Sequence, residues 1–247
     1  MAANRYSDLL AASYEASHAA SAVGDESFYR EHALAADGPV LEAACGTGRL
    51  YLDLLRAGVD ADGFDISRPM LNRLRRKSDD VTPRVWQADL RAPATDREYA
   101  RAFVPYNSIA NLTTVDDQLA ALDALHDVLE PGGRLVFDAF VPRFDVIAES
   151  FGEWHSEQSF EHEGGQFVAR TRATIEDTVA GTFRTEHEIQ RDGEVVAEES
   201  FVLAHLPPQQ IELLARESQF DEWTVAGGFD GEPLTDGDAV QVWTLRA

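Results

Sequence analysis

The chain has 247 residues, of which 44% are hydrophobic, and its formal net charge is −23 at pH 7. This length suits one large domain, or one domain with an inserted part, and the apolar content is enough for a buried core. No apolar run reaches the ~18–20 residues of a membrane span, and no charged-then-apolar signal opens the chain, so we expect a cytoplasmic protein that does not bind membranes. The lone cysteine, Cys45, excludes an internal disulfide, and we expect no metal site.

Acidic residues are spread along the chain without forming a tail, and Lys77 is the only lysine among 21 basic residues. Such a surface repels phosphate backbones, so we expect no nucleic-acid partner. Arginine in place of lysine, with dispersed acid, is typical of a halophilic-like protein that tolerates high salt, and salt would screen this repulsion.

Two helices are predicted in residues 1–38, over residues 6–21 and over Asp25–Leu34. Two interpretations of their aromatic side chains remain open. Phe28 and Tyr29 can pack in a core, or the whole segment can form a lid over the next element, with Tyr14 near a bound ligand.

The stretch Val40–Leu50, VLEAACGTGRL, predicts a buried strand, a glycine-rich turn and the start of a helix. Gly46 and Gly48 let the backbone turn sharply and let a ligand approach with no Cβ in the way. Free N–H groups at the helix start favour a polar or anionic ligand group. Tyr51 stands where a dinucleotide-binding fingerprint has its third glycine, which disfavours a nicotinamide or flavin oxidoreductase.

The next two predicted strands, Ala61–Asp65 and Arg84–Ala88, each end at an acid. Asp65 lies about 20 residues beyond the glycine turn, where a nucleoside-binding α/β unit places the acid that accepts the ribose hydroxyls. The alternative is an Asp that caps the following helix. Asp89 follows the other strand and can accept an adenine amino group.

A fourth strand, Tyr99–Pro105, an amphipathic helix, Asp117–Leu129, and a fifth strand, Arg134–Phe140, follow in order. Strands that alternate with helices in this way predict a doubly wound, mostly parallel sheet. Tyr106 and Asn107 stand at the carboxyl end of the fourth strand, where such sheets bind ligands.

Beyond residue 150 the pattern changes to four extended segments joined by hairpin turns at Glu163-Gly164-Gly165 and Asp192-Gly193. They predict an inserted antiparallel β-sheet. A helix, Pro207–Ser218, and two strands, Trp223–Ala226 and Ala239–Leu245, complete the chain. The four extended segments cover residues 153–162, 166–177, 182–191 and 194–204.

Five pieces of residues 39–142 together resemble successive motifs of the class I S-adenosylmethionine (SAM) methyltransferases of the small-molecule type. The resemblance implies a Rossmann-like fold, SAM as cofactor and S-adenosylhomocysteine as product. One departure is that Ala100 and Arg101 stand where the family usually has an acid near the start of the fourth strand. The five pieces are VLEAACGTGR, GFDISRPML, QADL, VPYNSIANL and LEPGGRLVFDAF.

Within this resemblance, Gly46 and Gly48 would face the methionine part of SAM, Asp65 the ribose, and Asp89 the adenine amino group. Ile66 and Leu90 would lie on the two faces of the adenine ring. The full cofactor-binding set that we expect is Tyr14, Glu42, Ala44, Gly46, Thr47, Gly48, Asp65, Ile66, Met70, Asp89, Leu90 and Val104.

The resulting hypothesis is methyl transfer from SAM to a nitrogen or oxygen of a small-molecule acceptor. The sequence identifies no catalytic base, and the candidates are Tyr14, Tyr29, Tyr106 and Asn107. A SAM-binding regulator without turnover remains the alternative, ahead of a nicotinamide-dependent oxidoreductase.

Four parts are expected: a helical lid (1–38), a cofactor-binding core (39–150), a β insertion (151–205) and a C-terminal part (206–247). The insertion would cap the acceptor site or join two subunits of a homodimer.

Overall fold

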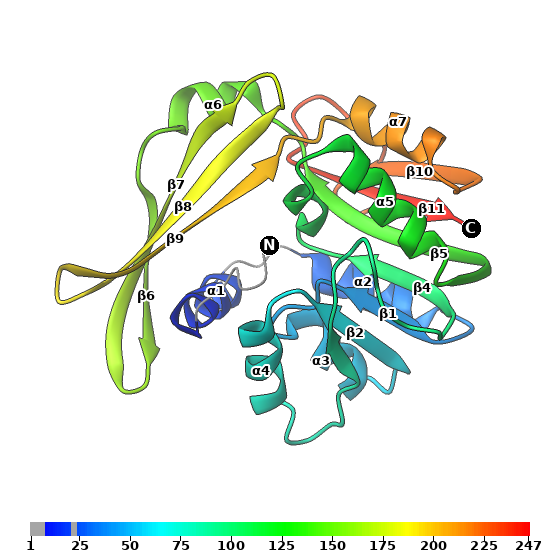
Figure 1. Cartoon of the computed structure of the whole chain (residues 1–247), viewed down its shortest axis with the longest axis horizontal. Helices are drawn as coiled ribbons and strands as arrows, with labels where there is room; N and C mark the ends of the chain where they lie inside the picture. The colour runs from blue at the N-terminus through cyan, green and yellow to red at the C-terminus, as the bar shows by residue number, and fades with distance from the viewer. Residues whose placement is uncertain (1–7, 21–23) are drawn as a thin grey trace.

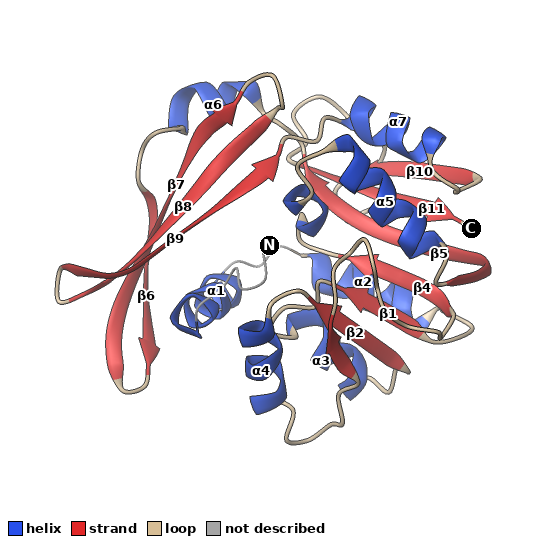
Figure 2. Ribbon diagram, in the orientation of Figure 1, coloured by secondary structure: helices blue, strands red, loops and turns tan. Residues whose placement is uncertain are grey.

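The computed structural model describes residues 8–20 and 24–247, which form two sheets with helices around the larger one (Figure 1). The larger sheet has seven strands in the order β10-β11-β5-β4-β1-β2-β3. The smaller sheet has four strands in the order β6-β7-β8-β9 and lies to one side of it (Figure 2). This architecture confirms the predicted α/β fold with an inserted antiparallel sheet.

Strands β1 to β5 of the larger sheet run parallel to one another, and β11 pairs antiparallel with both β5 and β10. Their carboxyl ends therefore meet at one edge, as the alternation of strands and helices predicts. The strands are β1 (Val40–Ala43), β2 (Ala61–Asp65), β3 (Val85–Gln87), β4 (Tyr99–Val104), β5 (Leu129–Phe140), β10 (Glu222–Gly227) and β11 (Val240–Arg246).

Each face of the larger sheet is covered by helices, because alternate side chains of its strands point to opposite faces. Leu41 and Phe137 lie in one apolar cluster, which includes side chains of α5 and α7. Val40 and Phe103 lie in the other cluster, which includes side chains of α2, α3 and α4. The helices are α2 (Asp25–Leu34), α3 (Arg49–Arg56), α4 (Arg68–Arg76), α5 (Val115–His126) and α7 (Pro208–Glu217).

The smaller sheet is built from consecutive antiparallel pairs. Its turns have the predicted geometry, since Glu163 and Gly164 have φ of 48° and 73°, and Asp192 and Gly193 have φ of 52° and 83°. Helix α1 (Asp8–Ala20) packs against β6 and α4, and so lies between the two sheets (Figure 1). The strands are β6 (His155–His162), β7 (Gly165–Asp177), β8 (Thr182–Arg191) and β9 (Glu194–Ala204).

The structure differs from the sequence prediction in several places. The helix expected over Asp117–Leu129 covers Val115–His126. Strand β5 begins at Leu129, so Glu130-Pro131-Gly132-Gly133 lies within the strand, where the pairing with β4 shifts in register. Two short helices were not predicted, η1 (Ser108–Asn111) and α6 (Phe144–Ser150). The expected ends of the first helix, residues 6–7 and 21, lie outside the described residues.

No helix in the described part of the chain is both long and apolar enough to cross a membrane.

Candidate active site

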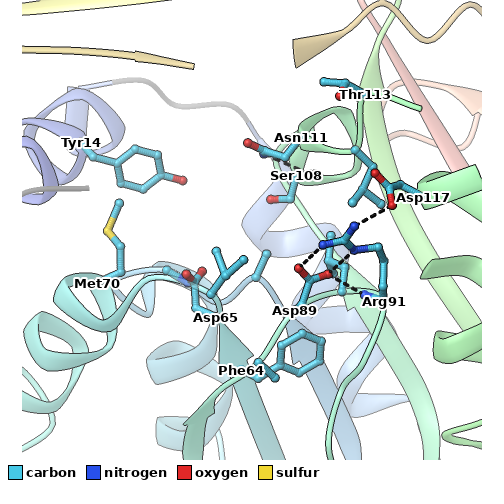
Figure 3. A pocket seen from close by; sticks show the side chains of 16 residues that line it. Tyr14, Phe64, Asp65, Met70, Asp89, Arg91, Ser108, Asn111, Thr113 and Asp117 are labelled. Atoms are coloured by element: carbon cyan, nitrogen blue, oxygen red, sulfur yellow. Dashed lines mark hydrogen bonds and ion pairs between the residues drawn. The ribbon is translucent and has the colours of Figure 1, made fainter. Parts of the chain in front are cut away.

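A cavity of about 360 Å³ opens at the carboxyl ends of β1, β2 and β3. Figure 3 shows Asp65 and Asp89 on its floor, with Tyr14 of α1 and Asn111 of η1 facing them across the opening. The sheet therefore brings together residues that the sequence places far apart. Eight of the twelve expected cofactor-binding residues line this cavity: Tyr14, Ala44, Gly46, Asp65, Ile66, Met70, Asp89 and Leu90.

Asp65 links the loops that follow β1 and β2. Its Oδ2 accepts a hydrogen bond from Gly46 N at 2.9 Å, and its Oδ1 accepts one from Ser67 N at 2.7 Å. Ser67, and not Asp65, is the N-cap of α4, because its hydroxyl accepts from Met70 N at 3.4 Å. Burial raises the pKa of Asp65 to about 6, against the bonds that these two amides donate. Each carboxylate oxygen has a second acceptor site, so the side chain can still accept hydroxyl groups of a ligand.

The two glycines of the first turn serve different purposes. Gly46 has φ of 54°, lines the cavity and has open space where a Cβ would lie. Gly48 has φ of 81°, but a Cβ there would lie 2.7 Å from Cγ of Leu74 in α4. The expectation that the missing side chain of Gly48 makes room for a ligand is therefore wrong, because that space belongs to the packing of α4 against the turn.

Asp89 is held by a side chain that the sequence analysis did not single out. Arg91 donates from Nε at 2.8 Å and from Nη2 at 2.7 Å to the two oxygens of Asp89, and from Nη1 at 2.6 Å to Asp117 of α5. Dashed lines in Figure 3 mark these contacts of Arg91 with Asp89 and Asp117 in the cavity wall. The fork geometry fixes the plane of the Asp89 carboxylate before any ligand binds.

Glu42 lies beneath the glycine turn and is 2% exposed. Its Oε2 has no hydrogen-bond partner among the described residues. Burial, with Asp25 and Asp65 nearby, raises the pKa of Glu42 to about 8, while Arg49 opposes the rise. A buried, unpaired carboxyl oxygen of this kind favours a cationic partner, since leaving it unsatisfied costs about 1–3 kcal/mol.

The remaining four expected cofactor residues, Glu42, Thr47, Gly48 and Val104, are not among the residues that line the cavity. Thr47 is 3% exposed, and Val104 is fully buried in the apolar cluster beneath α5.

The turn after β4 has a strained backbone and is stabilised by hydrogen bonds to Asp138 of β5. Tyr106 and Asn107 have φ of 59° and 55°, a region that non-glycine residues rarely adopt. Asp138 of β5 accepts hydrogen bonds from both of their amides, at 2.7 and 2.9 Å. The same carboxylate accepts from the hydroxyl of Tyr29 at 2.6 Å. Asp138 therefore stabilises a conformation that the local sequence disfavours.

The catalytic candidates divide accordingly. Tyr29 has no exposed surface and lies in an apolar cluster, which favours the packing interpretation over a contact with the acceptor. Tyr106 is half-buried, with its ring 6.2 Å from that of Tyr14 and 6.3 Å from that of Phe140. The side chain of Asn107 accepts a hydrogen bond from Phe140 N at 3.0 Å, which engages its oxygen.

Comparison with known proteins gives a consistent result. Residues 40–133 match the family model described as "Methyltransferase domain". The dTDP-3-amino-3,4,6-trideoxy-alpha-D-glucopyranose N,N-dimethyltransferase of Streptomyces venezuelae is 24% identical over 198 residues, which cover 80% of this chain and 78% of that protein.

Two solved structures share the fold over most of both chains. The CcbJ methyltransferase from Streptomyces caelestis superposes with a TM-score of 0.76 at 24% identity, covering 91% of this chain and 89% of that one. CalS10, described as an amino pentose methyltransferase from Micromonospora echinaspora with SAM bound, gives a TM-score of 0.70 at 19% identity and covers 99% of each chain.

Proposed function

We propose, given that this chain belongs to the class I SAM-dependent methyltransferases, that it transfers a methyl group from SAM to an amine nitrogen of a small-molecule acceptor. The family supports the transfer to a small molecule. The choice of nitrogen is supported by the relatives, one named as an N,N-dimethyltransferase of a sugar nucleotide and one described as a sugar N-methyltransferase.

The observation that carries the proposal is the order of polar groups along one sheet edge. Strand order places Asp89 after β3, Asp65 after β2 and Gly46 after β1, and all three line one cavity. We assign adenine to Asp89 and Leu90, ribose to Asp65, and the methionine part to the turn at Gly46. Glu42, with its unpaired buried oxygen, fits the methionine ammonium group as its partner.

SAM supplies an electrophilic methyl group on a sulfonium centre, so the chain mainly has to orient the acceptor and exclude water. Burial and the nearby Asp25 and Asp138 raise the pKa of Tyr106, against the effect of Arg49. Its hydroxyl therefore stays protonated at neutral pH and can orient an acceptor but cannot act as an anionic base. Tyr14, across the cavity, is assigned the same kind of orienting role.

In this proposal the part of the chain with the larger sheet binds the cofactor, and the smaller sheet contributes to the acceptor site. Residues 39–150 would bind SAM, and the insertion, residues 151–205, would wall the acceptor site. A homodimer joined through the insertion remains part of the proposal.

Titration calorimetry with SAM, S-adenosylhomocysteine and NAD tests the cofactor. We expect SAM to bind more tightly than NAD, and equal or tighter NAD binding would refute the proposal. Release of S-adenosylhomocysteine with matched amine and alcohol acceptors then tests the reaction, and SAM binding without turnover on any acceptor would favour the non-catalytic regulator. Asp65→Asn is the control for binding at the assigned ribose site.

A further inference from the structure

A second cavity, of about 340 Å³, lies between the core and the inserted sheet. Its walls come from the end of β5, from α6 and from the facing ends of β8 and β9. The residues that matter below are Asn107, Phe140, Ile147, Phe151, Phe183 and His205.

The strand order places this cavity next to the methyl-donating end of the cofactor site. The proposed function places adenine at β3, ribose at β2 and methionine at β1. The next strands in the sheet after β1 are β4 and then β5, so the methionine end of SAM points toward them. Ser108 lines the first cavity, and its neighbour Asn107 lines the second. The ring of Tyr106 contacts Tyr14 of the first cavity on one side and Phe140 of the second on the other. An acceptor in the second cavity would therefore reach the methyl group past a single turn.

The walls of this cavity are almost entirely apolar. Among the described residues that line it, Arg143 is the one with a permanent charge, and it is paired with Asp145 at 2.6 Å. A phosphorylated acceptor would have to compete with Asp145 for Arg143, the single cationic side chain among the described residues of this wall. An apolar body fits it better, because apolar contact with the walls removes hydrocarbon surface from water.

Three flat rings stand together in the wall. The rings of Phe183 and His205 are stacked with centroids 4.6 Å apart and planes at 28°. Phe151 also stacks on His205, at 6.2 Å and 23°. Stacked rings present flat surfaces that favour another flat ring.

His205 lines this cavity, and one polar atom of its side chain is unsatisfied. Nε2 of His205 is buried without a hydrogen-bond partner among the described residues. Burial also lowers the pKa of this imidazole, so the ring is neutral at pH 7 and can pair with a hydroxyl or an amine of a ligand. A ligand group that reaches Nε2 would remove the cost of leaving it unpaired.

We infer that the second cavity binds the body of the methyl acceptor, a flat apolar ring without phosphate that carries a hydrogen-bonding substituent paired with Nε2 of His205. This inference rests on the proposed function and names its substrate class. The amine to be methylated would extend from the ring past the Tyr106–Asn107 turn.

Binding of fluorinated probes, measured by ¹⁹F NMR in the presence of S-adenosylhomocysteine, tests the cavity. The probes are 3-fluorophenethylamine and 3-fluorotyramine, which differs from it only by a ring hydroxyl at position 4, and UDP-glucosamine serves as a phosphorylated amine competitor. Ile147→Trp fills the cavity from α6. Phe144→Trp is the matched control, because Phe144 lies on the same helix but is 77% exposed and lines no part of the cavity.

We expect both aromatic amines to bind the wild type and Phe144→Trp, and to bind Ile147→Trp at least tenfold more weakly, with SAM affinity equal in all three proteins. Equal probe binding by Ile147→Trp, or displacement of the probes by a lower concentration of UDP-glucosamine than of the tyramine, would overturn the inference. If the wild type itself did not bind SAM, the proposed function would be refuted instead.

His205→Phe tests the polar contact without emptying the cavity, and it keeps the test decisive if Ile147→Trp does not fold. The wild type should bind 3-fluorotyramine about tenfold more tightly than 3-fluorophenethylamine, as one hydrogen bond predicts. In His205→Phe this preference should disappear while the ring itself still binds. An unchanged preference in the variant would show that Nε2 does not contact the acceptor.

Discussion

The Tyr29–Asp138 hydrogen bond allows a sharp test of how the strained turn is held. In Tyr29→Phe the ring keeps its packing, but Asp138 loses the 2.6 Å bond from the hydroxyl. Both side chains are buried, at 0% and 2% exposure, so water cannot replace the donor. A hydrogen bond to a charged group contributes about 1.5–3 kcal/mol, which for a chain of this size corresponds to a fall in Tm of roughly 3–12 °C.

The same change should slow the reaction. The Tyr29 bond lowers the pKa of Asp138, which burial has raised, so its loss promotes protonation of the carboxyl group. A protonated Asp138 accepts more weakly from the amides of Tyr106 and Asn107, and the strained turn should relax. We expect kcat or the acceptor KM to worsen about tenfold or more, since small displacements near the reacting groups are costly, while the Kd for SAM stays near wild type.

Tyr99→Phe is the matched control. Its hydroxyl donates to buried Asp62 at 2.9 Å, at the opposite edge of the same sheet. Asp62 keeps Arg84 and Arg97 as partners, so the loss of stability should be smaller and the kinetics unchanged. Calorimetric melting and S-adenosylhomocysteine release measure the two effects. If Tyr29→Phe lost stability but kept wild-type kcat and KM, Asp138 would not position the turn for catalysis.

Three further predictions concern the cofactor, the charge and the insertion. Asp65→Asn should weaken SAM binding by ~1.5–3 kcal/mol, about ten- to a hundredfold, as calorimetry would measure. Because the pKa of Asp65 is raised to about 6 and the ionised form would accept the ribose hydroxyls, protonation of Asp65 should lower SAM affinity about tenfold by pH 5, and this step should be missing from the profile of the variant. The melting temperature should rise by several degrees from low to molar KCl, because ions screen the repulsion of a −23 chain, and a flat or falling curve would contradict this. Replacing residues 153–204 with a short glycine linker should leave SAM binding near wild type and abolish acceptor methylation; methylation at the normal rate by the folded, truncated protein would contradict the division of labour.

Local signals were enough to predict most of the elements. The predicted bounds of α2, β2, β8 and β9 agree with the structure, because glycine turns, acids at strand ends and period-two alternation mark their limits. The carboxylate of Asp65 was also predictable, since its distance from the glycine turn is set by one strand–helix–strand unit.

The residues that were missed act through contacts between distant segments. Asp138 gives one signal in the sequence, an acid inside the apolar strand LVFDAF, but its partners come from α2 and the β4 turn, which no local pattern links to it. Two other contacts were missed for the same reason. Gly48 packs against Leu74, and Arg91 forms an ion pair with Asp89, only once the helices have packed on the sheet.

The pairing of β11 with β5 has a consequence for synthesis of the protein. Val240 pairs with Phe140, so about 100 residues, including the whole inserted sheet, separate the two strands in the chain. At ribosomal rates of roughly 5–20 residues per second, β5 would wait ~5–20 s for the strand that covers its edge. The insertion consists of local hairpins and can form during that interval, whereas the seven-stranded sheet cannot close. Until β11 is made, β5 is paired with β4 along one edge only and its other edge stays open. Aggregation or chaperone binding would act on this protein at that stage.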